Sequence, residues 1–75
     1  VINSIYPNPT SGDLYINATA MKHVTVFNAM GQMVLDQEVS GDSMVLNMGQ
    51  LESGVYMVKV TTETGSNVKR INVVK

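Results

Sequence analysis

The clearest strand pattern in the chain is YMVKVT, residues 56–61. Tyr56, Val58 and Val60 occupy alternate positions there, so they share one face of an extended strand. Glu63-Thr64-Gly65 then predicts a hairpin turn, because glycine permits the backbone angles that a tight turn needs. A second alternating run, residues 67–74, answers the first. Together the two runs predict an antiparallel hairpin with one buried face.

The rest of the chain is divided by turn formers into five further short runs, at residues 2–6, 14–16, 23–28, 32–39 and 44–48. The predicted turns contain Pro7, Asn8, Pro9, Gly12 and Gly31, and we expect Gly12 to adopt a positive φ. Leu51 is expected to fill the core from the loop at 49–54. No window keeps apolar residues at helical spacing for three turns. The predicted fold is therefore all-β, an immunoglobulin-like antiparallel β-sandwich of about seven short strands, with a small open barrel as the alternative.

Length and composition predict one small domain that folds in water. The 75 residues give room for a single core, and the chain has no cysteine and one histidine, so neither disulfides nor a metal cluster is expected to hold it together. Hydrophobic residues make up 44% of the chain and charged residues 15%, which is typical of a folded domain. The formal charge of −1 includes no basic stripe, so no nucleic-acid partner and no anionic membrane is expected. Because the sequence opens directly in a strand pattern, we expect residues 1–75 to be a terminal domain of a larger protein.

No residue pattern in the chain predicts catalysis. His23 has no nucleophile or orienting carboxylate that the sequence can place beside it. The six carboxylates lack the spacing of a calcium loop, and each glycine stands alone at a turn, without a phosphate-binding cluster. We therefore predict no enzyme activity, no cofactor, no metal and no small-molecule substrate.

Methionine is frequent for so short a chain, with six residues at 21, 30, 33, 44, 48 and 57. Core filling is the favoured interpretation, because flexible apolar side chains suit a small core, with an adaptable binding surface or a soft metal site as alternatives. Asn17-Ala18-Thr19 matches a glycosylation acceptor pattern that often arises by chance. Lys69, Arg70 and Lys75 make the end of the chain basic, as expected either for a protected edge strand or for a recognised tail.

Four elements in order resemble a known family. They are residues 6–12 (YPNPTSG), residues 24–31 (VTVFNAMG), residues 51–56 (LESGVY) and the basic, β-branched end at residues 69–75. Together they cover essentially the whole chain, which resembles the type IX (Por) secretion system C-terminal sorting domains, type A. Asn28 is a departure, since the family more often has aspartate there, and this puts a carboxylate-specific contact at that position in doubt.

The resemblance implies a secretion signal and not a catalyst. It implies a Gram-negative cargo that crosses the periplasm, is recognised through this domain by the outer-membrane translocon and its shuttle protein, and reaches the outer membrane, the cell surface or the medium. It also implies that a cell-surface sortase cleaves before the domain and removes it.

A folded signal must present an edge strand or a fixed loop to its receptor. We expect the last strand and the Gly54 segment to do so, with the partner-binding residues Gly54, Tyr56, Lys69, Arg70, Val73, Val74 and Lys75. The turn residues named above shape the first and central turns. The same terminal strand would allow exchange between copies, giving a strand-swapped homodimer of the isolated domain.

Two other functions remain open from the sequence. A carbohydrate-binding or adhesion module would display exposed aromatic residues, but the chain has three tyrosines and one phenylalanine, and Tyr6 and Tyr56 are expected inside. A structural spacer is compatible with the fold alone.

Overall fold

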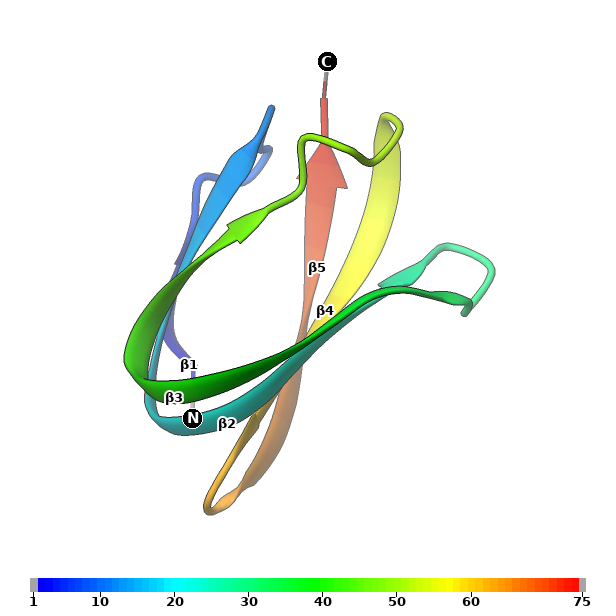
Figure 1. Cartoon of the computed structure of the whole chain (residues 1–75). Coiled ribbons are helices and arrows are strands. Elements are labelled where there is room, and N and C mark those ends of the chain that lie inside the picture. Colours follow the sequence, from blue (N-terminus) through cyan, green and yellow to red (C-terminus); the bar gives the residue numbers. More distant parts are fainter. Residues whose placement is uncertain (1, 75) are drawn as a thin grey trace.

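Five antiparallel strands build one strongly curled sheet in the computed structural model, which describes the backbone of residues 2–74 and the side chains of residues 4–74. The strands are β1 (Ile2–Tyr6), β2 (Asp13–Asn28), β3 (Met33–Asn47), β4 (Gly54–Thr62) and β5 (Gly65–Val73) (Figure 1). The described residues contain no helix, so none that could span a membrane. The all-β prediction is confirmed.

β2 and β3 form one long hairpin that bends without breaking (Figure 1). The bend lies at Ala20, which has a φ of 55°. The next residue, Met21, pairs with Gly41 of β3, which has a φ of 126°. The register shifts on both sides of Met21, which marks bulges in the ladder. The Ala20 N–H donates to Asp42 Oδ1 at 2.8 Å, and the Glu63 N–H donates to the Ala20 carbonyl at 3.2 Å. These bonds satisfy backbone groups that the bulge removes from regular pairing.

The predicted count of about seven strands is wrong for this reason. The predicted runs 14–16 and 23–28 are both parts of β2, and the runs 32–39 and 44–48 fall largely within β3. The residues between them bulge but continue the ladder, so the described chain has five strands in one sheet where two sheets were expected. A β-bulge and a turn use similar residues, and the sequence signal does not separate them.

The bend in β2 decides how the sheet closes. β1 pairs with the first half of β2, and β4 pairs with the second half, both along the edge opposite β3. β5 then pairs with β4, and a parallel bridge from Val73 to Thr10 links β5 to the segment that follows β1. The two ends of the curled sheet therefore meet.

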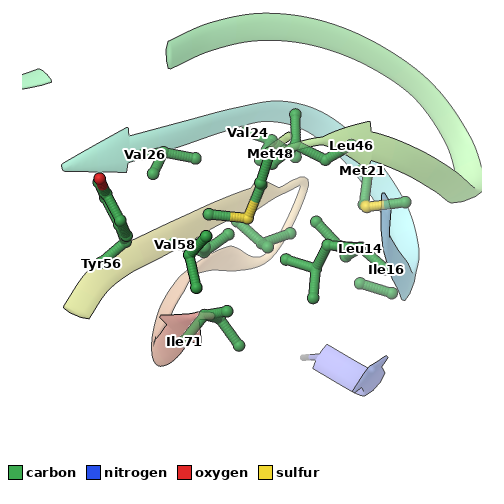
Figure 2. Close-up of a cluster of buried hydrophobic side chains, with 13 residues drawn as sticks. Leu14, Ile16, Met21, Val24, Val26, Leu46, Met48, Tyr56, Val58 and Ile71 are labelled. Carbon is green, nitrogen blue, oxygen red and sulfur yellow. The ribbon is translucent and has the colours of Figure 1, made fainter. Parts of the chain in front are cut away.

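The core fills the space inside the curl (Figure 2). Figure 2 shows side chains from both halves of β2, from β3, β4 and β5, and from the loop after β3 in this space, including Leu14, Ile16, Val24, Val26, Leu46, Met48, Tyr56, Val58 and Ile71. Val60 and Val73 belong to the same buried cluster. The buried face predicted for β4 is confirmed, and in the alternating run of β5 the buried residues are Ile71 and Val73. Leu51 is half-buried and packs against this core, as expected.

Two side-chain predictions are wrong in part. Met21 and Met48 are buried and Met44 packs against the core, but Met30, Met33 and Met57 are exposed. Tyr6 was expected inside, yet it is 50% exposed and stacks on Tyr15 with ring centroids 5.5 Å apart. Ile5 takes the inward position in β1, so alternation turns Tyr6 outward.

Candidate functional site

The end of β5 is held by the segment between β1 and β2. The Asn8 side chain donates from Nδ2 to the Arg70 carbonyl at 3.2 Å, and its Oδ1 accepts from the Asn72 N–H at 3.1 Å. Thr10 continues the contact: its N–H donates to the Asn72 carbonyl, and its carbonyl accepts from the Val74 N–H, both at 2.9 Å. The Asn8 amide thus replaces the backbone of a neighbouring strand, and we call residues 7–10 the clamp.

Thr10 fixes the clamp to the start of β2. Its side chain is buried, with Oγ1 donating to the Asp13 carbonyl at 2.9 Å and accepting from the Gly12 N–H at 3.2 Å. The Gly12 carbonyl accepts from the Met48 N–H at 3.0 Å. Gly12 lies in the predicted turn, but its φ is not positive, so that part of the prediction is wrong. The Thr10 hydroxyl, and not a left-handed glycine, shapes this turn.

The turn between β2 and β3 is organised by Asn28. Its Oδ1 accepts from the N–H groups of Met30 at 2.9 Å and Gln32 at 3.0 Å, while its Nδ2 donates to Gln32 Oε1 at 3.0 Å. Gly31 has a φ of 85°, as a glycine turn requires. An aspartate could accept the same two N–H groups, so an asparagine can shape this turn as the aspartate of the family pattern would.

The predicted partner-binding residues divide into exposed and buried groups. Gly54, Lys69, Arg70 and Val74 are exposed. Tyr56 and Val73 are only 8% and 2% exposed, so they can support a binding surface but hardly touch a partner. The Tyr56 hydroxyl donates to the Glu52 carbonyl at 2.7 Å, which fixes the loop before Gly54. Lys75 lies outside the described residues.

A groove of about 250 Å³ lies beside Gly54. It separates the β2–β3 turn from the loop before β4, and its lining includes Asn28, Met30, Glu52, Gly54 and Val55. The β2–β3 turn, which contains Gly31, and the loop that ends at Gly54 therefore lie at the same end of the molecule, on either side of the groove.

Sequence analysis missed a surface of apolar and basic residues on the outside of β4 and β5. Met57 pairs with Arg70 and Lys59 pairs with Val68 across the two strands, and Val55 lies two residues before Met57. We call these five residues the β4–β5 outer face. On the far side of Met57, Phe27 and then Met33 continue the row across β2 and β3. Alternation along each strand indicates which way these side chains point. The expectation that methionine fills the core nevertheless concealed how many apolar side chains face outward.

His23 lies beside a carboxylate that the sequence could not place. Its Nε2 contacts Asp36 Oδ1, and the Thr25 hydroxyl donates to the same oxygen at 3.1 Å. The hydrogen bond from His23 is the main cause that lowers the pKa of Asp36 below its usual 3.8. Because the Thr25 hydroxyl bonds to the carboxylate and not to the imidazole, this group is not a nucleophile with its base. Within the described residues, no three potential ligand side chains gather at one point as a metal site would require.

Comparison with known proteins finds one family model and two curated relatives that match most of this chain. The family model for the secretion system C-terminal sorting domain matches residues 4–75. An endo-acting ulvan lyase from Formosa agariphila is 30% identical over 74 residues, which cover 95% of this chain and 14% of the lyase. An ulvan lyase from Nonlabens ulvanivorans is 38% identical over 61 residues, which cover 76% of this chain and 11% of that protein. The chain thus spans only a small part of the length of both relatives.

Proposed function

Because the chain belongs to the secretion system C-terminal sorting domain family, we propose that the type IX outer-membrane translocon binds it through the end of β5 and the adjoining Gly54 segment. The family makes the domain a C-terminal secretion signal that interacts with the secretion machinery and is not itself catalytic. Its cargo is exported to the cell surface or released.

One observation carries the choice of surface. The clamp fixes the backbone of Arg70, Asn72 and Val74, while the side chains of Arg70 and Val74 remain exposed. A receptor therefore meets side chains in a defined arrangement and loses little conformational entropy on binding. Tyr56 and Val73 support this surface from inside, and Lys69 and Gly54 extend it. Lys75, which lies outside the described residues, is proposed as a binding residue from its place in the sequence.

The further steps of export follow the same proposal. Residues 1–75 act as one sorting domain of a larger secreted protein, which passes through the periplasm, engages the translocon and a shuttle protein at the outer membrane, and loses the domain to a cell-surface sortase. The lyase activities of the two relatives belong to those proteins, and the cargo of this chain is a separate matter.

The test is export of a fluorescent reporter. A signal peptide precedes the reporter and residues 1–75 follow it, in strains with and without a working type IX translocon. We expect surface or released reporter only in the competent strain, with the domain removed from the mature protein. Reporter that stays in the periplasm of both strains would contradict the proposal.

Sugar binding is a second candidate, favoured by the exposed Tyr6–Tyr15 stack. Tyr15 also pairs across the sheet with Val45, which is exposed, so an apolar row crosses the outer surface of β1, β2 and β3. Exposed tyrosines bind sugar rings through their apolar faces. A glycan array probed with wild type and with Tyr15→Ser separates the two functions, since sugar binding lost in the variant would favour this candidate.

A further inference from the structure

We propose that the outer edge of β5 between Ser66 and Arg70 is a strand-addition site for an acidic β-strand of the export machinery. The inference rests on the proposed function and specifies the chemistry of the partner. In this mode of binding, backbone hydrogen bonds join a partner strand to a free sheet edge, and alternate side chains supply specificity.

The clamp shows which backbone groups of β5 face outward. Arg70, Asn72 and Val74 direct their bonded groups toward Asn8 and Thr10. Because backbone direction alternates along a strand, the N–H and carbonyl of Val68 and Ser66 face the same way. In the described part of the chain, no hydrogen bond covers these groups, since β5 pairs only with β4 and with the clamp. The clamp therefore reaches the Arg70 carbonyl and leaves the outward backbone groups of Ser66 and Val68 uncovered.

This edge is the most regular one in the sheet. The β4–β5 ladder runs through nine residue pairs without a register shift, whereas the pairings of β1 and β3 with β2 contain shifts. β3 is also protected as an edge by exposed Asp36, Gln37 and Glu38, and β1 has only five residues before Pro7. Val68, in contrast, is 55% exposed at the centre of the uncovered segment. A regular edge with an exposed valine is a template for pairing.

Charge indicates the chemistry of the partner strand. Lys69 and Arg70 are exposed, Lys59 lies beside Val68, and none of the three forms an ion pair with a carboxylate among the described residues. A partner strand antiparallel to β5 would place an apolar residue opposite Val68 and carboxylates opposite Lys69 and Arg70. A second copy of this chain paired antiparallel through Val68 would place Lys69 opposite Asn67 and Arg70 opposite Ser66, which leaves the cations without carboxylate partners. A lipid surface would leave the backbone groups of the edge unpaired.

Hydrogen exchange on the chain fused behind the reporter tests the edge directly. The probe is a synthetic threonine-rich strand peptide with two glutamates followed by a valine, and the matched control peptide has lysines in place of the glutamates. We expect slower amide exchange at residues 66–70 with the glutamate peptide only. Charge reversal by Lys69→Glu and Arg70→Glu should lower the affinity for the glutamate peptide about tenfold and make the lysine peptide the tighter ligand. The proposal would be overturned if both peptides slowed amide exchange at residues 66–70 equally. It would also be overturned if exchange there slowed with rising protein concentration in the absence of peptide.

A proline substitution tests the same edge during export. Val68→Pro removes an N–H that faces away from β4, so the β4–β5 ladder keeps its bonds, and Val68→Thr is the matched control that retains the N–H. We expect Val68→Thr to be exported and Val68→Pro to be retained in the periplasm, with thermal unfolding confirming that both variants fold. Export of Val68→Pro at the level of wild type would refute strand addition while leaving the sorting function intact. Failure of wild type itself would instead refute the sorting function.

Discussion

Asn8 is the residue on which the two ends of the chain depend most directly. Its single side chain both donates to and accepts from β5, at positions 62 and 64 residues further along the chain. Asparagine can do this because one amide group carries a donor and an acceptor, as a peptide bond does. The same reasoning explains why the role was missed: a Pro-Asn-Pro sequence predicts a turn, but it contains no signal for a partner so distant in sequence.

We expect Asn8→Asp to destabilise the fold by about 1 kcal/mol, because it removes the donor to the Arg70 carbonyl and leaves an acceptor in its place. Asn67→Asp is the matched control, since Asn67 is exposed and its side chain makes no hydrogen bond within the described residues. Urea unfolding of the three proteins measures the difference. Equal unfolding midpoints for the two variants would show that the clamp contributes nothing.

Asp36 provides a prediction about pH. Its pKa is lowered in the folded state, first by the hydrogen bond with His23, so its charged form stabilises the fold at pH values above its unfolded pKa. That contribution is lost as the pH falls through the folded pKa, which lies below 3.8. We expect Asp36→Asn to be less stable than wild type near neutral pH and the difference in stability to shrink in acid, as the pH falls below 3.8 and through the lowered pKa of the folded state. Urea midpoints measured across that range, with Asp13→Asn as control, test this, and a gap of constant width would contradict it.

At the scale of the element, the bend of the β2–β3 hairpin depends on two unusual backbone positions. Ala20 has a φ of 55°, which costs a non-glycine residue energy, whereas Gly41 occupies a φ of 126° without that cost. A Cβ at Gly41 would meet no atom within 4 Å, so substitution there tests backbone conformation alone. The two sites therefore predict opposite effects.

We expect Gly41→Ala to lose about 1–2 kcal/mol of stability and Ala20→Gly to gain roughly 0.5 kcal/mol, because glycine relieves the strain but costs entropy. Gly12→Ala is the control, since its φ is not positive and a Cβ there would also meet no atom within 4 Å. Thermal unfolding gives the three differences. A Gly41→Ala variant as stable as Gly12→Ala would mean that the bend tolerates an ordinary backbone.

The same bend marks the limit of prediction from the sequence. Alternation of Tyr56, Val58 and Val60 identified β4 and its buried face, because a half-buried strand has a strict period of two. The bulge near Ala20 interrupts that period over a few residues, and a turn would do the same. Element type was therefore predictable, while the continuity of β2 and β3 was not.

At the scale of the whole molecule, the sheet is closed by contacts between its ends. The bridge from Thr10 to Val73 joins segments that are distant in sequence, and burial of Val73 follows from it. Sequence patterns assigned Lys69, Arg70, Val73 and Val74 to one candidate site because they are neighbours in the chain. The closed sheet separates them, since Val73 lies in the core while the other three side chains are exposed. Which of two adjacent valines is buried depends on the register of β5, which the clamp fixes.

This separation distinguishes recognition of a surface from a simple requirement for folding. Val73→Ser should lose about 2–4 kcal/mol of stability, because it removes buried methyl groups and places a hydroxyl in the core. Val74→Ser changes a side chain that is 52% exposed, so its stability should match wild type. If the translocon binds the surface at the end of β5, Val74→Ser will reduce export of the reporter although the domain is fully folded. Normal export of Val74→Ser, with loss of export only for Val73→Ser, would mean instead that the machinery requires a folded domain and binds it elsewhere.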